Sequence, residues 1–216
     1  MRAALILSLF LTMSVGAEEL VFEDDFKDKI AADWKWVRED AKAWRTAADG
    51  LEIRVLPGNM WGPPNNAKNV LVRPVPDPGR GRIEISAKVQ NEPTEQYEQV
   101  DLVWYYDDSN MVKIGLEQVD KKLCVVMGRE EKDRTRTIAV IPKGTRSIEL
   151  RLSVQGDKIE GHYRPHGADD WSRAGECTLP AHGKPKVSLQ AYQGPAGVER
   201  WAKITEFRIR RVSATK

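Results

Sequence analysis

Strict alternation of apolar and polar residues is the pattern that most limits what this chain can fold into. In the stretch 147–155, every second position is apolar, namely Ile148, Leu150, Leu152 and Val154. This period of two gives a β-strand one buried face. Beyond the N-terminal segment, no stretch of about eleven or more residues keeps the period of 3.6 that a helix needs. The sequence therefore predicts a nearly all-β fold.

Short turns join neighbouring strands into hairpins. The stretch 147–155 meets 158–164 across a tight turn, and 99–106 meets 111–117 across four turn-forming residues. Further strands are predicted at 20–26, 50–55, 70–73, 82–89, 122–127, 136–141, 171–178, 186–192 and 201–210. Many short strands at regular spacing are typical of a β-sandwich or barrel. Because no repeat or linker divides them, residues 18–216 are expected to form a single domain.

The N-terminus has the pattern of a secretory signal peptide. Arg2 precedes an apolar stretch that ends in small residues, with Val15 and Ala17 at the two positions that a signal peptidase reads. The stretch 3–17 is shorter than the ~20 residues that a membrane-spanning helix needs. We therefore expect residues 1–17 to be removed as a signal peptide, with no membrane insertion afterwards. The mature protein is expected to be secreted or periplasmic.

Charge and aromatic composition narrow the range of partners. The 34 Lys and Arg residues nearly balance the 32 Asp and Glu residues, for a net charge of +2, so no basic field favours nucleic acid as a partner. Seven Trp against four Phe is an unusual ratio, because Trp is common where one edge of a side chain meets a polar ligand. Five Trp lie in strand-like stretches and are expected in the core, namely Trp34, Trp36, Trp104, Trp171 and Trp201.

The two remaining tryptophans lie outside these strands. Trp44 stands in a segment with no clear pattern and receives no role. Trp61 lies in a long stretch at 57–69 that is rich in Pro and Asn and is therefore predicted to be a loop. Loops of this length are often functional, and a large ring there has no packing reason unless the loop folds over the sheet. Trp61 is the tryptophan whose position favours a function.

Several segments carry a family resemblance when their order and spacing are taken together. They are Phe-Glu-Asp-Asp-Phe at 22–26, Trp-Lys-Trp at 34–36, Asp-Gly-Leu at 49–51, Asp-Leu-Val-Trp-Tyr-Tyr-Asp-Asp-Ser-Asn at 101–110 with Val-Lys-Ile-Gly-Leu-Glu at 112–117, the hairpin segment 163–171 that ends in Trp, Val-Ser-Leu-Gln-Ala-Tyr-Gln-Gly at 187–194 and Ile-Thr-Glu-Phe-Arg-Ile at 204–209. In this arrangement the chain resembles the concanavalin A-like lectin/glucanase sandwiches, in particular the small bacterial type that occurs alone or as the C-terminal module of β-xylosidases. The resemblance implies a two-sheet jelly roll whose concave face commonly meets carbohydrate. Asp101 departs from the pattern, because related sandwiches often have glycine on this strand.

Successive side chains of a strand point to opposite faces of the sheet. Several polar and aromatic side chains of the predicted strands are therefore expected together on the face opposite the core. They are Gln99, Asp101, Tyr105, Lys113, Glu117, Gln190 and Tyr192, with Trp61 as a lid from the loop. Amides, carboxylates and aromatic rings are the groups that bind sugar hydroxyls and the CH faces of sugar rings. We therefore predict an exported carbohydrate-binding protein. The alternative is a solvated face held by cross-strand pairs such as Asp101 with Lys113.

Two further functions stay open at this point. Asp101 and Glu117 could be the carboxyl pair of a glycoside hydrolase or lyase that acts on (3-keto-)disaccharides or polysaccharide fragments. The Glu-x-Asp-x-x-Glu strand of the sandwich glucanases is absent, however. A structural or interaction module without a sugar ligand is favoured if the loop 57–69 fills the concave face. The identity of the glycan and the oligomeric state stay open.

No cofactor and no metal is expected from the residue pattern. His162 and His166 lie in a hairpin segment with Pro165 between them, so they do not share a helical face and are expected to be exposed turn residues. A structural Ca²⁺ ion where the first and last strands meet is a minor alternative. Its oxygen ligands would come from Glu23, Asp24, Asp25 and Glu206.

The two cysteines of the chain are Cys124 and Cys177. In an exported protein an even number permits one disulfide. A bridge requires the two β-carbons to face each other, which the sequence does not show. Two separate thiols that behave as small apolar side chains are therefore the alternative. Without paired metal-binding spacing, they do not form a zinc site.

Overall fold

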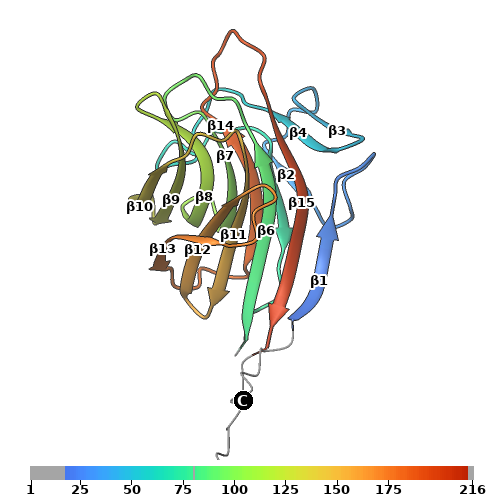
Figure 1. Ribbon diagram of the computed structural model, residues 1–216, viewed down its shortest axis with the longest axis vertical. Helices are drawn as coiled ribbons and strands as arrows, with labels where there is room; N and C mark the ends of the chain where they lie inside the picture. The colour runs from blue at the N-terminus through green and yellow to red at the C-terminus, as the bar shows by residue number, and fades with distance from the viewer. Residues whose placement is uncertain (1–17, 80, 214–216) are drawn as a thin grey trace, which may run out of the picture.

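The computed structural model describes residues 18–79 and 81–213. The expected signal peptide at 1–17 lies outside the described residues. Within them the chain forms fifteen β-strands in two antiparallel sheets that face each other (Figure 1). The predicted all-β, two-sheet sandwich is therefore confirmed. No helix in the described part of the chain is long and apolar enough to cross a membrane.

The eight-stranded sheet is formed by strands from the beginning, the middle and the end of the chain. Its order is β13 (Ser172–Thr178), β12 (Lys158–Pro165), β11 (Ser147–Gln155), β6 (Arg82–Gln90), β15 (Trp201–Val212), β4 (Gly50–Arg54) and β3 (Trp44–Ala47), and β1 (Glu18–Asp24) also pairs with β15. Strands that are far apart in sequence, such as β6 and β15, are therefore direct neighbours (Figure 1).

The seven-stranded sheet carries the candidate site. Its order is β10 (Arg134–Pro142), β9 (Lys122–Glu131), β8 (Asn110–Val119), β7 (Gln99–Asp107), β14 (Lys186–Tyr192), β5 (Val70–Pro74) and β2 (Lys35–Val37). The two predicted hairpins are β7 with β8 and β11 with β12, and both are confirmed. Strands β2 and β3 have three and four residues and are missing from the predicted strand ranges, although Trp36 of β2 was placed in a strand-like stretch.

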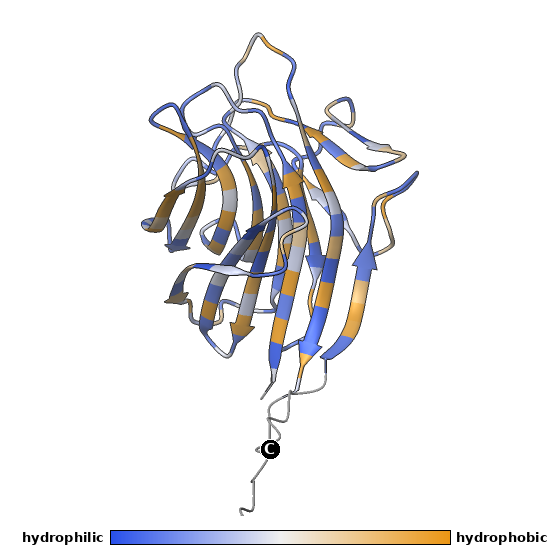
Figure 2. Ribbon diagram, in the orientation of Figure 1, coloured by the Kyte–Doolittle hydropathy of each residue, from blue (hydrophilic) through white to orange (hydrophobic). Residues whose placement is uncertain are grey.

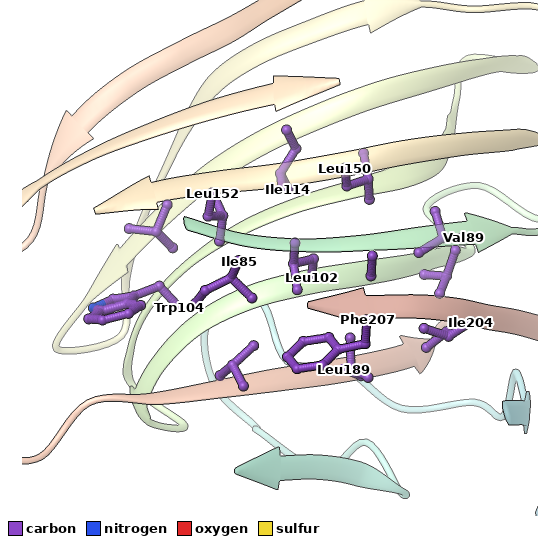
Figure 3. Close-up of a cluster of buried hydrophobic side chains, with 14 of the residues drawn as sticks. Ile85, Val89, Leu102, Trp104, Ile114, Leu150, Leu152, Leu189, Ile204 and Phe207 are labelled. Carbon is purple, nitrogen blue, oxygen red and sulfur yellow. The ribbon is translucent and has the colours of Figure 1, made fainter. Parts of the chain in front are cut away.

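The core lies between the two sheets. Apolar and polar residues alternate along most strands, as the orange and blue bands of Figure 2 show. The inward side chains of both sheets interlock in one cluster, which includes Leu102 and Trp104 from one sheet and Ile85 and Phe207 from the other (Figure 3). Burying a large apolar side chain stabilises the fold by ~1.5–3 kcal/mol. Burial of the apolar residues of this alternating pattern is therefore the main source of the stability of the fold.

The tryptophans divide differently from the prediction. Trp104 lies in the core at 1% exposure, and Trp34, Trp36 and Trp44 pack against its rim. Trp171 and Trp201 are not in the core, so that part of the prediction is wrong. Arginine guanidinium groups cover both rings: Arg151 and Arg164 lie 4.4 and 4.6 Å from the Trp171 ring centre, and Arg45 lies 4.2 Å from that of Trp201. Stacking on arginine replaces core packing at these two positions.

The calcium alternative finds no support near the first strand. The Asp24 carboxylate accepts hydrogen bonds from Phe26 N at 2.8 Å, Ala31 N at 3.0 Å and Trp34 Nε1 at 3.1 Å, so it fixes the loop after β1. The described residues contain no group of three His, Cys, Asp or Glu side chains that could hold a metal ion. His166 is exposed in a turn as predicted, whereas His162 lies within β12 and is half-buried.

The two cysteines are free thiols. Cys124 on β9 lies on the side of the seven-stranded sheet that faces away from the core, opposite Glu117 on β8. Cys177 on β13 packs against the core from the other sheet. Because the two side chains belong to different faces of different sheets, a bridge between them is impossible without moving strands. Of the two alternatives, the separate thiols hold.

Candidate functional site

The outer face of the seven-stranded sheet, which points away from the core, carries the predicted polar residues in neighbouring rows. Gln190 on β14, Asp101 on β7 and Gly115 on β8 stand side by side across the sheet. One row along, Gln99 on β7 lies between Tyr192 on β14 and Glu117 on β8. Two residues separate the rows because side chains alternate between faces. The alternation of side chains along neighbouring strands therefore brings residues from distant parts of the sequence together on this outer face.

The loop 57–69 folds over part of this outer face. Met60 and Ala67 are 0% and 1% exposed and form a second apolar cluster with side chains of the sheet, including Val103, Tyr105 and Met111. Trp61 lies against the backbone of β9 at Gly128, where a β-carbon would stand 2.4 Å from the indole ring. A glycine at this position is therefore required for the ring to approach the backbone of β9 this closely.

The loop is held by its own polar side chains and by the sheet. The Asn59 side chain accepts a hydrogen bond from Trp61 N at 3.0 Å and donates one to Trp61 O at 2.8 Å. Glu130 on β9 accepts a hydrogen bond from Gly62 N at 3.0 Å, and Arg38 donates to Ala67 O at 2.7 Å. Asn side chains that bond to nearby backbone fix loops without regular structure. The position of Trp61 is therefore set before any ligand arrives.

A pocket of about 480 Å³ opens beside this loop. Polar side chains from β7 and β8, here called the floor, line it together with aromatic and aliphatic side chains, here called the walls. The lining residues are Asn59, Trp61, Tyr97, Gln99, Lys113, Glu117, Val119, Val126, Thr137, Val140 and Gln193. Tyr97 and Val140 are 48% and 45% exposed, which is high for large apolar side chains. An open pocket with apolar walls and a few converging polar groups is the usual form of a small-molecule site.

The eight residues predicted from the sequence separate into two layers. Trp61, Gln99, Lys113 and Glu117 line the pocket. The other four lie beneath it or under the loop, each at most 4% exposed, namely Asp101, Tyr105, Gln190 and Tyr192. The pocket-lining residues that the sequence analysis missed are Asn59, Tyr97, Val119, Val126, Thr137, Val140 and Gln193. Asn59 shares the loop of Trp61, and this is the one signal that could have found it.

Tyr105 illustrates how the loop removes a predicted residue from the surface. Its hydroxyl donates a hydrogen bond of 2.6 Å to Asp108, and Arg38 binds the same carboxylate at 2.5 Å. Met60 packs in the same cluster as the ring. Tyr105 therefore supports the loop from below.

Lys113 is the centre of the polar floor. Its ammonium group donates to Glu117 Oε2 at 3.0 Å and to Gln99 Oε1, and it lies 3.9 Å from Asp101 Oδ2. It also lies 5.1 Å from the ring centre of Trp61. Burial alone would lower the pKa of Lys113, but Asp101, Glu117 and other nearby carboxyls raise it above its usual value. The floor is therefore a buried ion network around one permanent cation.

A larger hollow of about 650 Å³ lies beside the eight-stranded sheet. Its charges are paired with each other: Lys203 lies 2.6 Å from Asp49, and Arg208 lies 3.6 Å from Glu206. No aromatic ring lines it among the described residues. Because size alone does not make a binding site, the smaller pocket with aromatic walls is the candidate.

Residues 36–211 match the family DUF1349, which is described as protein of unknown function. The chain belongs to the DUF1349 family. It matches no curated protein. Residues of the candidate pocket, from Asn59 to Gln193, all lie within the part of the chain that the DUF1349 family covers.

Solved structures show where the DUF1349 fold recurs. The GH43 protein BlXynB from Bacillus licheniformis is similar with a TM-score of 0.75 at 20% identity, over 89% of this chain and 39% of that chain. Xylan beta-1,4-xylosidase from Bacillus halodurans is similar with a TM-score of 0.74 at 15% identity, over 87% of this chain and 38% of that chain. A functionally unknown protein from Saccharomyces cerevisiae has a TM-score of 0.65 at 14% identity, over 86% of this chain and 98% of that chain.

These similarities confirm the concanavalin A-like sandwich that the sequence resemblance implied. The chain spans about two fifths of the length of the two Bacillus proteins, as the shares of 39% and 38% show. Fold similarity at this level of identity does not carry over a substrate or an activity. For this DUF1349 member the site must therefore be argued from its own residues.

Two buried carboxyls of the floor hold their protons unusually tightly. Burial raises the pKa of Asp101 to about 6, against the lowering effect of the Lys113 ammonium. Burial likewise raises the pKa of Glu130 to about 7, although the Gly62 N–H and Lys113 favour its charged form. Neither carboxyl oxygen of Asp101 has a hydrogen-bond partner among the described residues. Burial of these carboxylates therefore outweighs the 3.9 Å contact of Asp101 with Lys113 and the hydrogen bond from Gly62 N to Glu130, and it favours the protonated forms.

Asp101 and Glu130 together should lower the free energy of unfolding by about 4 kcal/mol between pH 5 and pH 8. A carboxyl whose pKa is raised by folding stabilises the fold below its unfolded pKa, and this stability is lost as the pH rises through the folded value. Asp101 and Glu130 cross their folded pKa values of about 6 and 7 in this window. His162 acts in the opposite sense, because burial lowers its pKa from 6.5, and it reduces the slope near pH 6.

Urea unfolding at the two pH values measures this slope. Glu130→Gln should flatten it, because the amide oxygen can still accept the Gly62 hydrogen bond while the titrating proton is gone. The exposed carboxyl of Glu206, changed to Gln, serves as the matched control and should leave the slope unchanged. A wild-type protein that is equally stable or more stable at pH 8 would show that these carboxyls are not buried as described.

Proposed function

We propose that this protein binds carbohydrate in the pocket beside the loop 57–69. The observation that carries the proposal is the pairing of apolar walls with a polar floor in one pocket of about 480 Å³. The Trp61 ring offers a flat surface for the CH face of a sugar. Gln99, Glu117 and Gln193 offer amide and carboxylate groups that can bind neighbouring hydroxyls.

The pocket is pre-formed, which favours binding. The Gln99 amide nitrogen donates to Tyr97 O at 2.7 Å and to Gln193 Oε1 at 3.1 Å, and Lys113 donates to its oxygen. Side chains that are already fixed lose little conformational entropy when a ligand binds. The floor therefore needs little rearrangement to present its groups to a sugar.

The similar structures support the same ligand class. The two Bacillus proteins are named as a GH43 protein and a xylan beta-1,4-xylosidase, and this chain matches about two fifths of each of them. Their names describe those proteins as a whole and not the sandwich part alone. These names favour carbohydrate over other classes of small-molecule ligand, and we propose carbohydrate for the pocket on that basis.

We propose binding and not hydrolysis because the predicted carboxyl pair does not flank the pocket. Glu117 lines it, but Asp101 is 0% exposed and its carboxyl lies against Gly115. Glycoside hydrolysis needs two carboxyls on either side of the bond that breaks. A module without any sugar ligand is also less well supported, because the loop 57–69 covers one part of the face and leaves the pocket open beside it.

We further propose that the protein acts outside the cytoplasm, secreted or periplasmic. The support is the sequence pattern at 1–17, in which Arg2 precedes an apolar stretch that ends at Val15 and Ala17. Mass spectrometry of the mature protein from its own host tests this. An N-terminus at residue 18 is the expected result, and an intact Met1 would contradict it.

Trp61→Ala should weaken sugar binding by about 5- to 150-fold, because losing one aromatic stacking platform costs on the order of 1–3 kcal/mol. Isothermal titration calorimetry with neutral gluco-, manno-, galacto- and xylo-oligosaccharides first identifies the sugar that binds. Trp171→Ala is the matched control, because that ring lies against Arg151 and Arg164 on the other sheet. Equal loss in both variants, or no binding of any sugar by the wild type, would refute the proposal.

A further inference from the structure

Lys113, the one positively charged residue that lines the pocket in the described part of the chain, already contacts other side chains of the protein. Lys113 is 3% exposed, and its ammonium group contacts Gln99 and Glu117, with Asp101 at 3.9 Å. An ammonium group has three hydrogens to donate. Because two of these hydrogens go to Gln99 and Glu117 and the ammonium group is almost fully buried, an incoming anion would have to push one of these side chains aside to reach it. Among the described residues, no other Lys or Arg lines the pocket.

Negative groups outnumber this cation. Asp101, Glu117 and Glu130 all act on Lys113 and favour its charged form. Glu117 lines the pocket, while Asp101 and Glu130 lie behind the lining at 0% exposure. When the carboxyls are ionised, the floor carries a net negative charge. Charges in a low-dielectric environment are screened much less than charges on the surface.

The walls also favour a cation over an anion. Trp61 and Tyr97 line the pocket, and Lys113 already lies 5.1 Å from the Trp61 ring centre. The faces of aromatic rings are electronegative and attract ammonium groups. A carboxylate placed against the same faces gains nothing from them. The polar floor and the aromatic walls of the pocket therefore both favour a cationic ligand over an anionic one.

We propose that the pocket selects sugars by charge, and that it prefers an amino sugar whose ammonium group meets Glu117 and rejects a uronic acid. This inference rests on the proposed carbohydrate binding and narrows it to one substrate class. Glu117 is the specificity-determining residue, because it is the carboxylate that reaches the pocket surface. Lys113 holds it in place through the 3.0 Å contact.

The test compares sugars that differ only in charge. β-1,4-linked oligomers of glucose, glucosamine and glucuronic acid, and the corresponding galactose series, are titrated into the full protein at pH 6.5 and low salt. The amino sugar should bind about tenfold more tightly than the neutral sugar, and the uronic acid at least tenfold more weakly, because a charged hydrogen bond in place of a neutral one has about this effect.

Glu117→Gln should reverse the order. The substitution removes the charge that meets the ammonium group and frees Lys113 for an incoming carboxylate, so the amino sugar loses about tenfold and the uronic acid gains by a similar factor. Glu176→Gln on β13 of the other sheet is the matched control and should change neither affinity. Unfolding curves show whether the variants are folded. Should Glu117→Gln not fold, the ranking of the three sugars by the wild type decides alone.

The outcomes separate this inference from the proposed function. A neutral sugar or a uronic acid that binds as tightly as the amino sugar overturns the charge selection and leaves carbohydrate binding intact. A wild-type protein that binds none of the sugars, charged or neutral, overturns both. The amino sugar bound most tightly, with the order reversed in Glu117→Gln, supports both.

Discussion

Replacing Lys113 with Met should lower the free energy of unfolding by about 4 kcal/mol at pH 8, the range measured when one partner of a buried ion pair is removed. The methionine side chain is unbranched and only one atom shorter than lysine, so packing changes little. What is lost is the cation that Glu117 contacts at 3.0 Å and that lies 3.9 Å from Asp101. Both carboxyls are then buried without a partner.

The effect should shrink at pH 5. Asp101 and Glu130, with pKa values of about 6 and 7, are then protonated and no longer need a cation, so only Glu117 loses its partner. Urea unfolding of wild type and variant at both pH values measures the difference. Lys203→Met is the control, because Lys203 and Asp49 form an exposed pair that contributes at most ~1 kcal/mol. If the two variants lose the same stability, the ion network does not hold the floor together.

Gly115→Ala should lower the free energy of unfolding by about 3 kcal/mol, at the upper end of what overpacking a core costs. A β-carbon at this position would stand 1.7 Å from Asp101 Oδ1 and 2.8 Å from Val100 O. The Asp101 side chain is 0% exposed, so it has no free space to move into. The glycine on β8 thus provides the volume that the aspartate on β7 occupies.

A double-mutant cycle with Asp101→Ala tests this relationship. Asp101→Ala is measured alone as the reference of the cycle, because it removes the 3.9 Å contact with Lys113 as well as the atoms beside Gly115. In the double variant, the cost of Gly115→Ala should fall by about 2 kcal/mol, because residues in contact are not additive. Gly144→Ala meets no atom within 4 Å and serves as the control. Additive effects of the two substitutions would show that Asp101 does not fill the space beside Gly115.

The fold could be predicted because alternation is a direct record of which face of a strand is buried. Both hairpins and the sandwich follow from it. Strands β2 and β3 were missed because three and four residues are too few to show a period. Trp171 and Trp201 were placed in the core because a Trp in a strand pattern suggests burial. Nothing local indicates that arginines from other strands will cover such a ring.

For the candidate site, the sequence predicted which face of the sheet carries it, but not how deeply each of its residues is buried. Parity correctly groups side chains such as Gln99 and Glu117 across neighbouring strands. The depth of each residue depends on where the loop 57–69 comes to lie, and that is a long-range packing event without a local pattern. For this reason Asp101 and Tyr192 lie beneath the pocket, while Tyr97 lines it. Their contacts with a sugar stay a prediction.

The separation of Cys124 and Cys177 has a practical consequence for production of the protein. Burial raises the pKa of both thiols, that of Cys177 to about 11, so neither is a reactive thiolate near neutral pH. Folding therefore needs no oxidant and no disulfide isomerase. The chain should reach the same native state in a reducing cytosol as in an oxidising compartment, and a reductant in the buffer should not change its unfolding curve.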